Sequence, residues 1–545
     1  MLEGLMQDDF QLTLRPILDR MRTINGDSEV VTLTKEGKTR ATYAEVGARV
    51  DRLCHALDGL GVKQGDRVAS FCWNSQHHLE IYMALPCMGA VLHTLNLRLF
   101  PDQLTYIVNH AEDQIIFVDD SLVPLIEKAA DTFEGVRNFI VIGDGDSGSL
   151  PNVLRYEDLI AEASSEPYDY PELDERTAAA LCYTSGTTGN PRGVLYSHRS
   201  TVAHTLAECA TDVFGICRAD RVLPVVPMFH ANAWGLPYCC AMTGADMIMP
   251  GPFLQAEPLA KLIEEEKPTI AGAVPTIWLD LLRYADEHKP DMSSLRLVPC
   301  GGSAVPLSLM KGFEERHGVK IIQAWGMTEM SPLGSVAHPP LDLVGDEAWA
   351  FRATAGQIAP FVEARIVAED GTVQPWDGES TGELQVRGPW VVKQYYNDPD
   401  SAEKFDGDWL RTGDVACIDN RGYIRISDRS KDVIKSGGEW ISSVELENEL
   451  MAHPGVREAA VIAKPDERWS ERPLACVVTE EDAPPAEELH AFLSERVAKW
   501  MVPDEFAYIA EIPKTGTGKF DKKVLRGALA EDKLEGRVLV EKAPA

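Results

Sequence analysis

The sequence predicts an α/β protein with a large N-terminal domain of doubly wound sheets, a β subdomain and a small α+β C-terminal domain. Three observations predict this class. Short apolar strands alternate with amphipathic helices, antiparallel strand patterns follow residue 360, and a charged segment near residue 430 precedes the C-terminal part. A chain of 545 residues is also too long for one small core, so it divides into two or more domains.

The N-terminal part carries the alternating pattern. Thr42 and Glu45 form a capping box, and apolar residues recur at helical spacing behind it. Apolar runs at 67–71, 115–118 and 139–142 have Gly or Asp near their ends, as strands do. Strands that alternate with helices pair in parallel, which predicts a doubly wound sheet.

The pattern changes twice in the rest of the chain. A second α/β stretch runs from residue 178 to about 334, and the runs 363–367 and 382–386 predict antiparallel strands. A boundary falls at 428–432. Beyond it, a serine cap at Ser442 starts a further helix, so the C-terminal part is a plausible small domain.

Composition excludes several classes of protein. The formal net charge is -33, from 85 acidic and 52 basic residues, which argues against nucleic acid or an anionic membrane as the main partner. The most apolar stretches are broken by Pro, Gly or Asp, so we expect no membrane span. The 11 cysteines include no Cys-x-x-Cys pair, which favours reduced thiols in a cytoplasmic protein over disulfides or a zinc site.

The most informative motif is the segment 183–194, Tyr-Thr-Ser-Gly-Thr-Thr-Gly-Asn-Pro-Arg-Gly-Val. Its glycines let backbone N–H groups converge on an anion, and its hydroxyl groups and Arg192 add donors, which predicts a phosphate site. No Gly-Lys-Ser/Thr closes the loop, so it is not a Walker motif. The alternative is an ordinary turn rich in Gly and Thr.

Three further motifs are weak when each is considered alone. The segment 325–329 places a carboxylate after an apolar strand, where it suits Mg²⁺ beside a polyphosphate or simply ends the strand. The segment 409–414 ends in an acid on a tight turn, which accepts ribose hydroxyls or caps the turn. Lys519 lies on a glycine-rich loop, where a solvated lysine is the ordinary case.

Taken together and in this order, the motifs resemble those of the AMP-forming adenylating enzymes, from about residue 12 to residue 529. The segments 223–230 and 435–442 resemble those of the medium- and long-chain fatty acyl-CoA ligases. One departure is Arg192, because the phosphate loop of these enzymes usually ends in Pro-Lys-Gly. The resemblance implies an N-terminal adenylation domain at 1–428, a hinge at 429–432 and a mobile C-terminal lid domain at 433–545.

The activity implied by the resemblance is the ATP-dependent conversion of a medium- to long-chain fatty acid to acyl-CoA through an acyl-adenylate, with ATP, Mg²⁺ and coenzyme A. A short or substituted acid such as a methylthio-propionate is one alternative substrate. Another adenylate-forming enzyme, or a nucleotide-binding regulator without catalysis, is an alternative function. The partners are small molecules, and a homodimer is left open.

The resemblance also assigns residues to roles. Thr184 and Glu329 hold Mg²⁺, Lys519 bridges the substrate carboxylate and the α-phosphate, and His230 places the carboxylate, with Trp234 either bordering the acyl site or filling core. Lys431 is the pivot about which the C-terminal domain rotates. The remaining ligand-binding residues are Ser185, Gly186, Thr187, Thr188, Gly189 and Arg192 for the β- and γ-phosphates; Gly302, Ser303, Ala304, Gln323, Ala324 and Trp325 for adenine; Thr328 near the α-phosphate, with Gly326 and Met327 also binding the nucleotide; Asp414 and Arg429 for ribose; and Gly437, Gly438 and Trp440 for coenzyme A.

Overall fold

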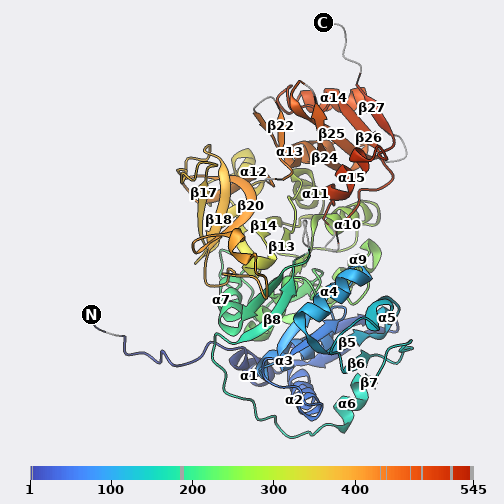
Figure 1. Ribbon diagram of the computed structural model, residues 1–545, viewed down its shortest axis with the longest axis vertical. Coiled ribbons are helices and arrows are strands. Elements are labelled where there is room, and N and C mark those ends of the chain that lie inside the picture. The colour runs from blue at the N-terminus through green and yellow to red at the C-terminus, as the bar shows by residue number, and fades with distance from the viewer. Residues whose placement is uncertain are drawn as a thin grey trace.

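In the computed structural model of the protein, the described residues are 2, 4–184, 190–429, 431–436, 439–466, 468–479, 483–515 and 519–540, with the backbone alone at 439 and 440. Their strands form four sheets, three in the N-terminal part and one in the C-terminal part (Figure 1). The predicted combination of α/β sheets, a β subdomain and a separate C-terminal α+β unit is confirmed.

The seven-stranded sheet carries the predicted doubly wound arrangement. Every neighbouring pair is parallel except the last, in which β8 and β9 flank the phosphate-loop motif and run antiparallel. In spatial order, its strands are β7 (Val153–Arg155), β6 (Asn138–Ile142), β5 (Asp113–Asp119), β3 (Arg67–Phe71), β4 (Val91–Thr94), β8 (Ala178–Tyr183) and β9 (Gly193–Ser197).

The five-stranded sheet brings together the N-terminus and the middle of the chain. Strand β1 lies beside β11, more than two hundred residues later, in parallel register with Val30 opposite Met247. In spatial order, its strands are β12 (Ile270–Gly272), β10 (Arg221–Pro224), β11 (Asp246–Met249), β1 (Glu29–Thr34) and β2 (Gly37–Thr42).

Helices of the N-terminal part pack on these sheets through apolar faces (Figure 1). The predicted capping box is confirmed, because the Thr42 side chain accepts from the Glu45 N–H at the start of α2. The helices of this part are α1 (Arg15–Thr23), α2 (Tyr43–Gly59), α3 (Gln76–Cys87), α4 (Pro101–Ala111), α5 (Val123–Ala130), α6 (Tyr156–Glu162), α7 (His198–Glu208), α8 (Leu236–Thr243), α9 (Ala256–Glu266), α10 (Pro275–His288), α11 (Leu307–His317) and α12 (Gly345–Arg352), with short 3-10 turns at Asp120–Leu122, Ala231–Gly235, Thr328–Met330 and Ser401–Lys404.

The nine-stranded sheet joins the second α/β stretch to the β subdomain. The predicted antiparallel pair is confirmed, since Glu363 in β17 lies opposite Arg387 in β18. In spatial order, the strands are β13 (Val298–Gly301), β14 (Ile321–Gly326), β15 (Leu333–Val336), β16 (Gly356–Ile358), β21 (Tyr423–Arg429), β20 (Trp409–Ile418), β18 (Gly382–Arg387) and β17 (Glu363–Val367), with β19 (Phe405–Asp406) paired to β20.

One local expectation is wrong in this sheet. Asp414 lies inside β20 and not at the end of a tight turn. Gly413 has a φ of 73° there, and the register of β20 against β21 shifts just after Asp414, at Val415. The glycine therefore bends a continuous strand and does not end it.

The C-terminal part has its own sheet and its own apolar cores. The chain leaves the nine-stranded sheet at Arg429 and enters the C-terminal sheet at Ile434. Figure 1 shows this part, in red, above α10 and α11. Its elements are β22 (Ile434–Ser436), β23 (Glu439–Ile441), α13 (Ser443–Met451), β24 (Val456–Asp466), β25 (Ser470–Thr479), α14 (Ala486–Ser494), β26 (Glu505–Tyr508), α15 (Lys522–Ala530) and β27 (Arg537–Leu539).

Across the ranges that the structure describes, no helix combines the length and the apolar character that a membrane crossing requires.

Candidate active site

The two ends of the phosphate-loop motif meet between β8 and β9. The Thr184 N–H donates to the Arg192 carbonyl at 2.9 Å, and the Arg192 N–H donates to Thr184 Oγ1 at 3.3 Å. The Arg192 side chain pairs with Asp398, with 3.1 Å between Nε and Oδ2. The predicted ligands Ser185, Gly186, Thr187, Thr188 and Gly189 lie outside the described residues.

Glu329 sits on a 3-10 turn at the end of β14, close to the same region. Its carboxylate is 8% exposed, and Oε1 accepts from the Tyr395 hydroxyl at 2.7 Å. The Thr328 carbonyl accepts from the Tyr196 hydroxyl at 2.6 Å, which fixes the turn.

The donor set fits a magnesium ion that also binds ATP. Glu329 offers one carboxylate oxygen that is not engaged by Tyr395, and Thr184 offers a hydroxyl oxygen. In the described part of the chain, no three His, Cys, Asp or Glu side chains converge on a point. An ion here would therefore take its other ligands from phosphate and water, as Mg²⁺ commonly does.

The predicted ribose residues form a connected group on neighbouring strands. Asp414 is 2% exposed, and its Oδ2 accepts from the Trp325 indole N–H at 3.0 Å. Its Oδ1 lies 2.7 Å from Arg429 Nε. Strands β14, β20 and β21 of one sheet therefore bring together three residues that lie far apart in the sequence, and the carboxylate keeps acceptor capacity for hydroxyl groups.

Side-chain hydrogen bonds and tight backbone turns together position the predicted adenine residues. The Gln323 side chain is engaged within the protein, because its Oε1 accepts from the Val305 N–H at 2.7 Å and its Nε2 donates to the Thr354 carbonyl at 2.9 Å. Ser303 is exposed and Ala304 half-buried, directly after the turn at Gly302, which has a φ of 90°. Ala324 lies so close to Gly301 that a Cβ on that glycine would stand 2.6 Å from the Ala324 carbonyl oxygen.

The turn after Trp325 is equally tight. A Cβ at Gly326 would stand 1.8 Å from the Pro332 carbonyl oxygen, so only glycine fits. The next N–H, that of Met327, donates to the same oxygen at 3.2 Å. These contacts fix the orientation of the turn that carries Thr328 and Glu329.

Lys519 belongs to the C-terminal part, and its side chain reaches the predicted nucleotide-binding residues of the N-terminal part. A Cβ at Gly302 would stand 3.5 Å from Lys519 Cε, so the lysine side chain lies against that turn. Burial and then the positive charge of Arg429 lower the pKa of Lys519 to about 8, while Asp414 and Glu329 oppose the shift. The ammonium is therefore largely charged at neutral pH.

His230 lies near Lys519 and is neutral. Burial, followed by the charge of Lys519, lowers the pKa of His230 to about 3. Its ring therefore carries one donor and one acceptor nitrogen throughout the physiological range. Such a ring can orient a carboxylate or a carbonyl without adding charge.

A left-handed turn follows His230 directly. Ala231, Asn232, Ala233 and Trp234 have φ values of 40°, 52°, 50° and 57°. The Trp234 indole is 7% exposed and lies over two glycines, because Cβ atoms at Gly272 and Gly301 would stand 3.5 and 3.8 Å from the ring. Trp234 thus occupies space next to the adenine turn and His230.

The structure describes only some of the residues predicted for the hinge and for coenzyme A. Lys431 lies between β21 and β22, and the N–H groups of Asp432 and Val433 both donate to the Arg429 carbonyl, at 2.8 and 2.9 Å. Gly437 and Gly438 lie outside the described residues, and of Trp440 only the backbone is described, paired with Lys435 in the strand ladder.

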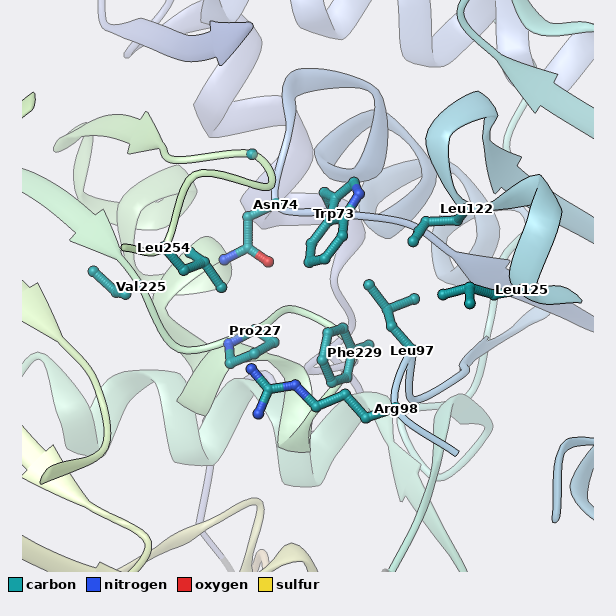
Figure 2. Close-up of a pocket in the computed structure, with 11 residues that line it drawn as sticks. Trp73, Asn74, Leu97, Arg98, Leu122, Leu125, Val225, Pro227, Phe229 and Leu254 are labelled. Carbon is teal, nitrogen blue, oxygen red and sulfur yellow. The ribbon is translucent and has the colours of Figure 1, made fainter. Parts of the chain in front are cut away.

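A cavity of about 190 Å³ is lined in part by Val225, Pro227 and Phe229, from the segment that leads to His230 (Figure 2). Pro227 and Phe229 form one wall, and Trp73 and several leucines form the others. Arg98 also lines it, and burial lowers the pKa of this guanidinium. The cavity suits a slender apolar chain that ends in an anion.

The sequence motifs missed the segment that contains Tyr395 and Asp398. Tyr395 contacts Glu329 and Arg192, and Asp398 contacts Arg192. The only signal was a turn-forming run, Asn-Asp-Pro, at 397–399.

Comparison with known proteins adds independent findings. The family described as AMP-binding enzyme matches residues 22–396, and the family described as AMP-binding enzyme C-terminal domain matches residues 445–519. The chain is 45% identical to a 3-methylmercaptopropionyl-CoA ligase of Ruegeria lacuscaerulensis, over 94% of this chain and 97% of that protein. It is 43% identical to a medium-chain-fatty-acid–CoA ligase of Ectopseudomonas oleovorans, over 95% of this chain and 96% of that protein.

Among solved structures, the anthranilate CoA ligase AuaEII in complex with anthranoyl-AMP superposes with a TM-score of 0.87. The sequence identity is 27%, and the match covers 96% of this chain and 99% of that chain.

Proposed function

We propose, from the premise that this chain belongs to the AMP-binding enzyme family, that it is an AMP-forming acid–CoA ligase. Its substrates are a carboxylic acid, ATP and coenzyme A. The observation that carries the proposal is the half-buried Lys519 side chain, which the C-terminal part places against Gly302 and near the Asp414 and Glu329 carboxylates. The predicted resemblance to AMP-forming adenylating enzymes is confirmed by the family match and the relatives described above.

The first step activates the acid. A carboxylate oxygen attacks the α-phosphorus of ATP, the bond to the bridging oxygen breaks, and pyrophosphate leaves with the electron pair. The reactants are both anions, so the site must supply positive charge and positioning. Lys519 supplies charge at the reacting centre, neutral His230 orients the acid, and Asp414 with Arg429 holds the ribose. Glu329 and Thr184 would hold Mg²⁺ together with ATP, and the ion would add positive charge at the phosphates.

The second step uses the thiol of coenzyme A. The thiol loses its proton to water, the thiolate sulfur attacks the carbonyl carbon of the adenylate, and AMP leaves with the electron pair of the anhydride oxygen. Lys519 occupies the approach to that carbon, so the C-terminal domain must move between the steps. We assign the pivot to Lys431, where the chain passes from one sheet to the next.

The cavity of Figure 2 is the proposed path for coenzyme A. Its aromatic and aliphatic walls suit the pantetheine arm, and Arg98 suits a phosphate at the far end. Phe229 lines the cavity and precedes His230 in the chain, so we assign to this cavity the approach of the thiol to the activated carbonyl.

For the acid, a medium- to long-chain fatty acid is the leading substrate, based on the segments 223–230 and 435–442. One observation favours a short acid such as a methylthio-propionate instead. The Trp234 indole fills the space beside Gly272 and Gly301, so a long acyl chain requires that the ring move aside.

The test measures pyrophosphate release and coenzyme A consumption across straight-chain acids of increasing length, with 3-methylmercaptopropionate included. A maximum at medium or long chains supports the leading substrate, and a maximum at the short sulfur-containing acid supports the second. Pyrophosphate release without coenzyme A consumption indicates another adenylate-forming enzyme. No release with any acid contradicts the proposal and favours a nucleotide-binding regulator.

A further inference from the structure

The segment 390–398 joins the two elements that are predicted to bind the phosphates and the metal ion. The Val392 N–H donates to the Glu329 carbonyl at 2.8 Å, and the Tyr396 N–H donates to the Gly193 carbonyl at 2.8 Å. The segment is therefore fastened at one end to the turn of Glu329 and at the other end to the strand that leaves the phosphate loop.

Between these two fastenings, the Tyr395 side chain contacts both elements. Its hydroxyl donates to Glu329 Oε1 at 2.7 Å, and the Arg192 guanidinium carbon lies 5.2 Å from the centre of its ring. Asp398 holds that guanidinium in place through the Nε–Oδ2 contact of 3.1 Å. The Tyr395 side chain is 6% exposed, so water competes little with either contact.

The direction of this hydrogen bond suits the role. A carboxylate oxygen only accepts, so the Tyr395 hydroxyl is the donor. Tyr395 therefore fixes one carboxylate oxygen of Glu329 and leaves the other free of this contact.

We infer that Tyr395 is a positioning residue for metal-bound ATP, which couples the orientation of the Glu329 carboxylate to the Arg192 end of the phosphate loop. The inference rests on the proposed function, in which Glu329 binds Mg²⁺. Hydrogen bonds to ligating carboxylates orient them toward the metal, and losing one typically costs about 10–100-fold in metal affinity or activity.

The same geometry explains what arginine does at position 192. A planar guanidinium can pair with Asp398 through Nε and still lie over the Tyr395 ring. A lysine offers a single ammonium group and cannot make both contacts in this way. Arg192 thus contacts Tyr395 and Asp398 together, in addition to the phosphate role predicted for it.

The test compares Tyr395→Phe with Tyr396→Phe. The second variant removes the neighbouring hydroxyl, which donates no hydrogen bond within the described ranges, and leaves the backbone fastening to Gly193 intact. Titration calorimetry measures the Kd for MgATP without a carboxylic acid, so that no turnover occurs, and the Kd for AMP, which needs no metal ion.

For Tyr395→Phe, we expect the Kd for MgATP to rise about 10-fold and the Kd for AMP to stay within twofold of the wild type. For Tyr396→Phe, we expect neither to change. An equal rise for MgATP and AMP would show a general structural role and would overturn the inference. An unchanged MgATP Kd in a folded Tyr395→Phe protein would also overturn it.

A Glu329→Gln variant separates this inference from the proposed function. If Glu329→Gln weakens MgATP binding and Tyr395→Phe does not, the metal role of Glu329 stands and the positioning role of Tyr395 falls. If Glu329→Gln leaves MgATP binding unchanged, both fall.

Discussion

Replacing Lys519 with arginine should remove the alkaline limit of the adenylation step. In the wild-type protein, the Lys519 ammonium loses its proton as the pH rises through about 8, because burial and Arg429 lower its pKa. Only the protonated form carries the charge that the first step needs, so the rate falls with rising pH. The guanidinium of the Lys519→Arg variant would stay charged, because an arginine in a protein keeps its proton.

The magnitude follows from a pKa of about 8. Wild-type kcat/KM for adenylate formation should be about one half of its maximum at pH 8 and about one tenth at pH 9, because this parameter reports the titration of free enzyme. Lys519→Arg should have a lower maximum but no decline up to pH 9.5. Lys519→Ala should lose about 10²–10³ in rate at pH 7, as is typical when one transition-state donor is removed.

The assay is the exchange of pyrophosphate with ATP between pH 6 and 9.5, with the acid and ATP both below saturation, and it isolates the first step. A second assay supplies preformed acyl-adenylate and coenzyme A, and here Lys519→Ala should keep most of its rate. If the decline above pH 8 persists in Lys519→Arg, another group is responsible and the assignment is wrong. Equal losses in both assays would contradict a role confined to the first step.

Three further predictions concern the domain movement and the acyl site. Proline fixes φ near about -65°, so Lys431→Pro should hinder rotation at this position. We expect adenylate formation to stay near normal and thioester formation to slow. Unchanged rates in both assays would exclude Lys431 as the pivot. Asp428→Asn should slow adenylate formation several-fold, because Asp428 precedes the proposed hinge and its Oδ2 accepts from the N–H of Ser443, which follows the hinge, at 2.7 Å. The pyrophosphate exchange rate measures this effect. Ser427→Ala is the control, since Ser427 accepts through its backbone carbonyl. Trp234→Ala should shift the coenzyme A consumption profile toward acids longer by several carbons, and an unchanged profile would show that the indole does not limit chain length.

Much of the fold follows from local patterns in the sequence. The strand β3 has the predicted bounds, and the capping box at Thr42 starts α2 as expected. Both depend on residues within a few positions of each other. The placement of Asp414 failed because Gly413 has the composition of a turn, while the pairing of β20 with β18 and β21 depends on residues many positions away.

Site residues that belong to a sequence motif could be predicted. Residues that reach the site only through a contact between distant parts of the chain could not. Trp325, Asp414 and Arg429 each belong to a motif, and the structure brings them together. Tyr395 lies outside these motifs, because its hydrogen bond to Glu329 spans 66 positions and a single tyrosine in a loop carries no periodicity. The hydrogen bonds of the Gln323 amide to Val305 and Thr354 also join residues far apart in the sequence, so no local pattern predicts them.

The left-handed turn after His230 connects the two residues to which we assign recognition of the acid. Four consecutive residues other than glycine with positive φ cost about 1–3 kcal/mol each, so surrounding contacts must hold them. Gly235 ends the turn against α7, where a Cβ would stand 2.7 Å from Glu208 and 2.8 Å from His204. The His204 ring is itself fixed, because its Nε2 accepts from the Leu333 N–H at 3.2 Å. The residue proposed to orient the carboxylate and the residue proposed to limit the acyl chain, Trp234, are thus carried by one rigid turn. A change that moves the indole must also move the imidazole unless it is confined to the indole side chain.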